Sequence, residues 1–141
     1  MATLNKFHVF VEHLVKGVHN LSAHTLKVYL TNVAPDSSTM SVKADLAEIS
    51  AGAGYPAGGN AVTITGSSHT GGAYRLAGVS TTFAVSGGSV GPFRSVVLYN
   101  STPTSPPDPL IGWGDYGRSI TLLDGDGLTV DFAATILALA E

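Results

Sequence analysis

Two apolar runs joined by a proline-rich loop constrain the fold of this chain more than any other part of its sequence. The first run, FRSVVLY, covers residues 93–99, and the second, LIGW, covers residues 110–113. A glycine turn, Gly87-Gly88, comes before them. Runs rich in β-branched and aromatic residues between Gly and Pro signals are typical of strands. We expect this pair at the centre of a sheet, because each large apolar side chain contributes about 1.5–3 kcal/mol on full burial.

The start of the chain carries a helical pattern instead. Glycine is favoured just beyond the end of a helix, and Gly17 stands at that place. The pattern predicts one N-terminal helix over about residues 4–16. Its apolar side chains recur at the i, i+3, i+4 and i+7 spacing of a single helix face: Phe7, Phe10, Val11 and Leu14.

From about residue 25 onward the sequence favours short β-strands. Residues 26–31 alternate between apolar side chains and a second set that is mostly polar, which predicts a half-buried strand. Residues 42–50 fit either a helix or a strand. The glycine-rich residues 51–59 predict a flexible connection.

Turn signals divide the rest of the chain. The glycine-rich residues 66–72 predict a turn, and the sequence DGDG at 124–127 has the composition of a tight β-hairpin turn. Short strands separated by about ten residues predict a mainly β fold, either an antiparallel β-sandwich or a jelly-roll-like barrel, as one domain over residues 1–141. The strands expected around these turns cover residues 62–65, 74–85, 119–123, 128–132 and 135–139.

Charged residues are unusually scarce. They make up 12% of the 141 residues, about half the roughly 25% of an ordinary soluble domain. The remaining surface must be rich in Gly, Ser and Thr, or apolar and covered by another copy or a partner. This favours a homo-oligomer that works in an assembly. The net charge of −3 provides no attraction for nucleic acid, and no run approaches the ~18 apolar residues of a membrane span.

Residue types that carry chemistry form no recognisable site in the sequence. Asp124, Asp126 and Asp131 resemble the start of a calcium loop, but Thr135 stands where an EF-type loop requires Glu. The five histidines lack the i, i+4 spacing of a helical metal site, so we expect them at the surface or at an interface. The chain has no cysteine, which excludes thiol chemistry. We expect no enzyme activity, no metal and no cofactor.

The loop between the two apolar runs stands apart in its composition. Four prolines fall within residues 103–109, and proline fixes φ and favours an extended polyproline II conformation. Such a loop loses little entropy when a partner binds it, although a stiff connector without a partner fits the same sequence. The candidate contact residues are these prolines and two nearby aromatic residues: Pro103, Pro106, Pro107, Pro109, Trp113 and Tyr116.

Three parts of the chain carry a resemblance. They are NKFHVFVEHLVKGVHNL at 5–21 with HTLKVYLTNVAP at 24–35, GGSVGPFRSVVLYNSTPTSPPDPLIGWGDYG at 87–117, and SITLLDGDGLTVDF at 119–132. Together they resemble a group of small tailed-bacteriophage proteins. The resemblance implies a virion structural component, in first place a decoration (cement) protein on the capsid surface that is present in the host cytoplasm during assembly. It brings no catalytic or binding motif.

Three functions stay open at this point. In the first, a homo-oligomer, with a trimer favoured, clamps neighbouring subunits of the major capsid protein. The second places the same β-sandwich in the tail or in a head fibre. The third is a carbohydrate-binding module with Trp113, Tyr116 and Tyr99 as a stacking platform, because an aromatic ring offers an apolar face. None of the three requires a nucleic acid or a membrane as partner.

Overall fold

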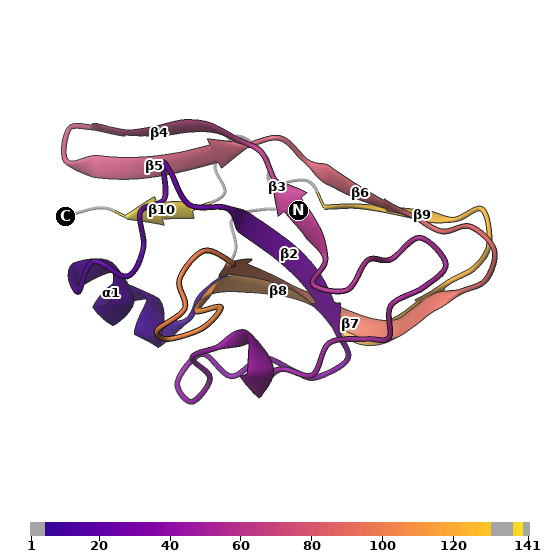
Figure 1. Cartoon of the computed structure of the whole chain (residues 1–141). Coiled ribbons are helices and arrows are strands. Elements are labelled where there is room, and N and C mark those ends of the chain that lie inside the picture. The colour runs from indigo at the N-terminus through magenta and orange to yellow at the C-terminus, as the bar shows by residue number, and fades with distance from the viewer. Residues whose placement is uncertain (1–4, 131–136, 140–141) are drawn as a thin grey trace.

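Strand β7 (Val90–Asn100) is the middle strand of the largest sheet, as the apolar run 93–99 predicts. The computed structural model describes residues 5–130 and 137–139, the latter as backbone alone. Its five-stranded sheet has the order β1-β8-β7-β2-β3, and every pair of neighbours is antiparallel (Figure 1). The other strands of this sheet are β1 (Asn5–Lys6), β2 (Leu26–Thr31), β3 (Asn60–Val62) and β8 (Leu110–Leu122).

The large sheet is covered on both faces around β2 and β7. Its buried apolar side chains form two separate clusters, which we call the first cluster and the second cluster. Val28 belongs to the first cluster and its neighbour Tyr29 to the second. Strand β7 divides its side chains in the same way, with Leu98 in the first cluster and Val97 in the second. The prediction of a half-buried strand at 26–31 is therefore wrong. Strand β2 lies between β7 and β3, where alternate side chains enter two different cores.

Two smaller antiparallel sheets cover the first cluster. Their strands are β4 (Ile64–Thr70), β5 (Ala73–Gly78), β6 (Thr81–Ala84), β9 (Gly127–Val130) and β10 (Leu137–Leu139). One sheet has the order β10-β5-β4, and the other pairs β6 with β9. They extend to opposite sides of the molecule (Figure 1). Leu76, Phe83 and Val130 of these sheets pack in the first cluster, so the small sheets face the large one.

The predicted fold class is confirmed: the chain is mainly β, its sheets are antiparallel, and one short helix stands near its N-terminus. Within the described residues no sheet closes into a barrel, so the jelly-roll-like barrel is not formed. The strand region predicted at 74–85 contains β5 and β6, which form on either side of Val79 and Ser80.

Helix α1 (His8–Val15) is shorter than the predicted helix at 4–16. The two residues before Phe7 form β1, which pairs with β8, and residue 4 lies outside the described residues. The buried face also differs from the predicted one, because Phe10 is fully buried whereas Val11 is 51% exposed. Pairing with a strand more than a hundred residues away replaces the first helical turn, and local periodicity does not contain that information.

The helix ends at the glycine stop that the sequence predicts. Gly17 has a φ of +79°, a conformation that glycine adopts without strain. Its N–H bonds to the C=O of Leu14 at 3.2 Å, and the N–H of Val18 bonds to the C=O of His13 at 2.9 Å. This pair of bonds is a Schellman motif. It turns the chain sharply, so the residues after the helix run back beside its last turn.

Two predicted turns differ in the structure. Strand β4 continues to Thr70, so the turn predicted at 66–72 is only Gly71-Gly72. The DGDG turn at 124–127 joins β8 to β9, and β9 pairs with β6 rather than with β8. The predicted hairpin at this turn is therefore wrong. Asp-Gly composition indicates a tight connection, but it does not select the partner of the next strand.

Strand lengths differ as well. Strand β8 runs without interruption from Leu110 to Leu122 and includes most of the strand expected at 119–123. The last expected strand, at 135–139, is present as β10 over its final three residues, and residues 135–136 lie outside the described part.

Residues 32–59 form none of the strands of the three sheets, and their side chains pack against both clusters. They contain one short 3-10 helix, η1 (Lys43–Asp45), where the sequence fits either a helix or a strand. Leu46 is 1% exposed and packs in the second cluster. Tyr55 is 2% exposed and stacks on Phe83 with ring centroids 5.4 Å apart. The stretch at 51–59 is therefore an ordered connection, contrary to the prediction.

A half-buried carboxylate fastens this segment to the sheet. Glu48 accepts hydrogen bonds from Lys43 Nζ at 2.9 Å, from the Tyr55 hydroxyl at 2.6 Å and from the Gly58 N–H at 2.7 Å. The Tyr55 hydroxyl in turn accepts a bond from the Leu30 N–H of β2 at 3.1 Å. We call the carboxylate, its lysine and three surrounding tyrosines the Glu48 network: Glu48, Lys43, Tyr29, Tyr55 and Tyr99.

Protonation states in the Glu48 network follow from its contacts. Burial alone would raise the pKa of Glu48, but the bonds from Lys43, Tyr55 and Gly58 outweigh it and lower that pKa. Burial raises the pKa of Tyr99 to about 12, so its hydroxyl stays protonated and donates to the Gly58 C=O at 2.7 Å. The ammonium of Lys43 lies 4.9 Å from the centre of the Tyr29 ring, within cation–π range.

Candidate binding surfaces

The proline-rich loop folds back on itself instead of extending. Thr104 and Pro107 form an antiparallel bridge, and the Asn100 N–H donates to the C=O of Pro109 at 3.0 Å. From outside the loop, the backbone N–H of Lys43 donates to the C=O of Asp108 at 2.9 Å. The predicted extended conformation is therefore wrong, because these backbone bonds hold a turn that local proline preferences do not specify.

The four prolines of the loop differ in exposure. Pro107 is exposed, Pro103 and Pro106 are half-buried, and Pro109 is buried. A partner that approaches the loop meets Pro107 first. Pro109 instead belongs to the start of the β8 region, where its C=O closes the loop.

The predicted aromatic platform is not assembled. Trp113 packs against the second cluster, and its Nε1–H donates to Ser37 Oγ at 2.8 Å. Tyr116 packs against the first cluster, edge-on to Phe93 with ring centroids 6.2 Å apart. Tyr99 is only 3% exposed. The three rings stabilise two different cores and do not form one stacking surface.

The turn carboxylates bond to the backbone. Asp124 Oδ1 accepts from the Gly87 N–H at 3.1 Å, and Asp126 Oδ2 accepts from the Leu123 N–H at 2.9 Å. Asp131, the third residue of the calcium comparison, lies outside the described residues. Within residues 5–130 no group of three or more His, Asp or Glu is arranged to hold a metal ion.

Three histidines meet around one asparagine next to the end of α1. Asn100 is fully buried, and its Nδ2 lies 3.0 Å from His19 Nδ1 and 2.9 Å from His24 Nδ1. The rings of His13 and His19 are 6.0 Å apart. We call His13, His19, His24 and Asn100 the histidine cluster. Two histidines depart from the expectation of surface or interface positions, because His13 is 8% exposed and His19 is 6% exposed within this chain, whereas His8 and His69 are exposed.

The hydrogen bonds of Asn100 fix the tautomers of two of these rings. An amide nitrogen only donates, so Nδ1 accepts in both His19 and His24, and each neutral ring carries its proton on Nε2. His19 Nε2 and His13 Nδ1 are buried and have no hydrogen-bond partner among the described residues. Burial, together with the neighbouring His13 and His24, lowers the pKa of His19 to about 4. Burial also lowers the pKa of His13.

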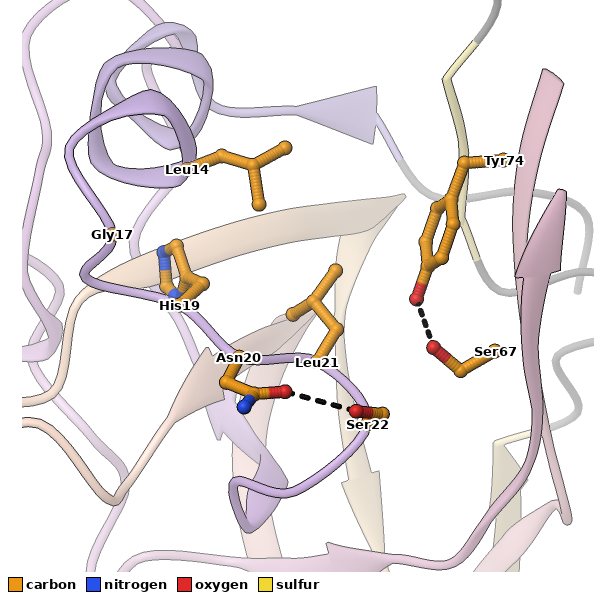
Figure 2. A pocket seen from close by; sticks show the side chains of 8 residues that line it. All are labelled: Leu14, Gly17, His19, Asn20, Leu21, Ser22, Ser67 and Tyr74. Carbon is orange, nitrogen blue, oxygen red and sulfur yellow. Dashed lines mark hydrogen bonds between the residues drawn. The ribbon is translucent and has the colours of Figure 1, made fainter. Parts of the chain in front are cut away.

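A cavity of about 560 Å³ opens beside the histidine cluster (Figure 2). Its two walls come from different parts of the fold, and we call it the helix–hairpin cavity. Leu14, Gly17, His19, Asn20, Leu21 and Ser22 line it from α1 and the following loop, and Ser67 and Tyr74 line it from the β4–β5 hairpin. The Ser67 and Tyr74 hydroxyls are hydrogen-bonded at 2.6 Å, and Ser22 Oγ donates to Asn20 Oδ1 at 2.9 Å.

Neither the cavity nor the histidine cluster is apparent from residue spacing along a helix. His13 precedes the Gly17 stop, whereas His19 and His24 follow it. The glycine stop is the one signal that points to their meeting, because it turns the chain back toward the helix. The tyrosine and serine of the opposite wall come from a hairpin far along the chain, and no local pattern joins them to the histidines.

No helix in the described part of the chain is long and apolar enough to span a membrane. Comparison with protein-family models, with curated protein sequences and with solved structures finds nothing that matches the chain.

Proposed function

We propose that this chain is a decoration protein of a tailed-bacteriophage capsid, which binds the major capsid protein on the outside of the head as a homo-oligomer. A trimer is the favoured oligomer, because shell lattices offer three-fold positions. The proposal rests on the resemblance of residues 5–35 and 87–132 to small phage proteins and on the shortage of charge. One structural observation supports it further: an unprotected sheet edge.

That edge is strand β4. It is the outer strand of the three-stranded sheet, and no described strand pairs with its free side. Figure 1 shows it along the margin of the molecule. In an antiparallel ladder every second residue points its N–H and C=O away from the partner strand, so β4 presents a row of backbone donors and acceptors.

The edge has little of the usual protection against pairing. Free-standing proteins block such edges with charged residues, proline or β-bulges. Ile64–Thr70 contains no charged residue and no proline, and its one irregularity, between Ile64 and Gly66, leaves Ser67–Thr70 in regular register. Such an edge suits a chain whose β4 is covered by another subunit in the assembly. The outer surface of α1 is also suited to contact with another subunit, because it exposes two valines. Val11 is 51% and Val15 82% exposed, and the two lie one helical turn apart.

The carbohydrate module of the sequence-based alternatives loses its basis, because Trp113, Tyr116 and Tyr99 lie in two cores. A tail or head-fibre location is separated from decoration by electron cryo-microscopy of the intact virion. Density for the chain on the outer face of the head supports the proposal, and density confined to the tail or a fibre contradicts it.

A charge placed on the edge tests the role of β4. In Ser68→Lys the charge blocks strand pairing, so we expect weaker self-association in sedimentation velocity and weaker attachment to heads that lack the protein. Ala44→Lys is the matched control, since Ala44 is exposed and lies in η1, away from β4. Equal attachment of both variants contradicts an edge contact, while the location of the density still tests decoration.

The exposed proline offers a second contact to probe. Pro107→Ser removes the exposed ring of the loop and leaves the buried Pro109 in place. If the loop touches the capsid, this variant detaches at lower salt or temperature than the native protein, with an unchanged melting temperature in solution.

A further inference from the structure

We propose that the helix–hairpin cavity binds a neutral saccharide. This inference goes beyond capsid decoration and uses none of the aromatic residues of the platform considered above. The cavity lies between the loop after α1 and the β4–β5 hairpin (Figure 2). Its volume of about 560 Å³ falls within the roughly 300–1,000 Å³ of small-molecule sites.

The lining of the cavity carries no formal charge at neutral pH. Its residues are apolar, hydroxyl or amide side chains, apart from His19. Burial keeps His19 neutral, since its pKa is lowered to about 4. An ionic ligand would lose hydration here without gaining a counter-charge from the wall, which is costly. The lining therefore selects an uncharged ligand.

The polar groups of the lining suit hydroxyls. One of the Ser67 and Tyr74 hydroxyls donates to the other at 2.6 Å, so the second O–H can donate outward, and lone pairs remain that can accept. Asn20 Oδ1 accepts one bond from Ser22 at 2.9 Å, and its amide N–H groups remain available. A sugar hydroxyl both donates and accepts, so it pairs with each of these groups.

The apolar groups of the lining suit the other side of a sugar ring. Figure 2 shows the Tyr74 ring across the cavity from Leu14 and Leu21. The C–H face of a pyranose packs against an aromatic ring, whose face carries partial negative charge. An amide and hydroxyls around one aromatic ring and two leucines therefore match both the polar edge and the apolar face of a saccharide.

The loop wall is held in place before any ligand arrives. The Asn20 N–H donates to His24 Nδ1 at 3.2 Å, and the Asn20 C=O accepts from the His24 N–H at 2.8 Å. The Schellman motif at Gly17 fixes the other end of this loop. A wall that is already ordered reduces the entropy lost on binding.

Nuclear magnetic resonance titration of the isotope-labelled full chain tests the proposal. The probes are maltose and N,N′-diacetylchitobiose as neutral disaccharides, with glucose 6-phosphate as the charged comparison. We expect saturable shifts of the Asn20, Ser67 and Tyr74 amides with a neutral disaccharide at millimolar concentration and none with the phosphate. No saturable shift up to about 20 mM of either disaccharide, a weak limit for specific binding, overturns the proposal, as does equal binding of the phosphate.

Two tyrosine variants provide the matched pair. Tyr74→Phe removes a hydroxyl from the cavity and keeps the ring, so we expect about threefold to tenfold weaker binding, the loss of one hydrogen bond. Tyr116→Phe makes the same change outside the cavity and leaves binding unchanged. Equal affinity of the two variants overturns the assigned site. If Tyr74→Phe melts at a lower temperature, Ser22→Ala on the opposite wall replaces it, with the same expected direction. Capsid attachment is scored separately, so failure here does not bear on decoration.

Discussion

Two polar groups, one buried and one half-buried, lie at opposite ends of strand β2 and differ in how completely they are hydrogen-bonded. Asn100 of the histidine cluster pairs with Leu26 at the start of β2, and Glu48 bridges to Thr31 at its end. The Glu48 carboxylate has three donors around it. In the histidine cluster, His13 Nδ1 and His19 Nε2 are buried without a partner among the described residues.

The difference shows what each group contributes to the molecule. A fully bonded buried network makes one arrangement of the chain much more stable than its alternatives. The Glu48 network does this for residues 32–59, which contain one short 3-10 helix and otherwise no regular structure. In the histidine cluster, the two unpartnered ring nitrogens gain no hydrogen bond on burial. The cluster is therefore stable only while its imidazole rings are neutral. We therefore expect rigidity from the first group and pH dependence from the second.

The largest effect is expected at Gly59, next to the Glu48 network. Its φ is +80°, and a Cβ there would collide with the C=O of Val28 in β2. We expect Gly59→Ala to lower the free energy of unfolding by about 3 kcal/mol or more, because backbone atoms must move. Gly17→Ala is the control: its φ is +79° but nothing lies within 4 Å, so only the left-handed strain of about 1–2 kcal/mol remains. Urea unfolding measures both, and equal losses would contradict the close approach at Gly59.

Breaking the Glu48 network is the next largest change. Glu48→Ala leaves the Lys43 ammonium and the Gly58 N–H without their acceptor. The Glu48 side chain is only 16% exposed and the Lys43 side chain only 20%. We expect a loss of about 2–4 kcal/mol in the free energy of unfolding. Glu12→Ala breaks an ion pair with Lys16 that is 60–65% exposed, and such pairs contribute about 0–1 kcal/mol. Similar losses for the two variants would show that the Glu48 network is not a fastening point.

The sequence predicts the central strands and the end of α1, but it does not predict the Glu48 network. The apolar runs at 93–99 and 110–113 identify the central strands, because dense burial leaves a local trace in composition. Gly17 identifies the end of α1 for the same reason. The Glu48 network leaves no such trace, since Glu48 and its partners join loops and strands through side-chain hydrogen bonds. Its residues look like ordinary polar and aromatic positions until the chain is folded.

Candidate sites were harder to predict than strands. The proline loop was expected to extend on local preference, and long-range backbone bonds such as Lys43 to Asp108 hold it folded. Trp113 and Tyr116 are three residues apart on β8, and side chains alternate between the two faces of a strand, so the two rings pack against different clusters. The helix–hairpin cavity joins residue 20 to residue 74, and only the packing of the hairpin beside α1 creates it.

Acid should act on the histidine cluster before it acts on the Glu48 network. His19 has a pKa of about 4 in the folded chain, against about 6.5 when unfolded. Its neutral form therefore stabilises the fold fully above about pH 6.5, and this contribution is lost as pH falls toward 4. We expect the free energy of unfolding to drop by about 1–2 kcal/mol between pH 7 and pH 5.

Two variants assign this loss. His19→Gln should reduce the fall between pH 7 and pH 5 to the part that the lowered pKa of His13 contributes, whereas His69→Gln, at an exposed position, should leave it unchanged. The lowered pKa of Glu48 stabilises the fold above the unfolded pKa of about 4.3 and is lost only below it. Glu48→Ala should therefore retain the same fall over this window. An undiminished fall in His19→Gln would place the pH dependence elsewhere.

The smallest expected change in pH dependence comes from a substitution in the centre of the histidine cluster. Asn100→Asp replaces the amide donor by a carboxylate, which only accepts, so His19 and His24 must then present N–H groups to it. A nearby negative charge favours the protonated imidazole and raises its pKa. The variant should be less stable than the native chain at pH 7, because a buried carboxylate loses its hydration, but it should lose about 1 kcal/mol less on going to pH 5. Thermal melts of both proteins at pH 7 and pH 5 measure this difference in pH dependence. Parallel pH profiles would show that Asn100 does not set the protonation of the cluster, and the contrast with the Glu48 network would then rest on hydrogen-bond count alone.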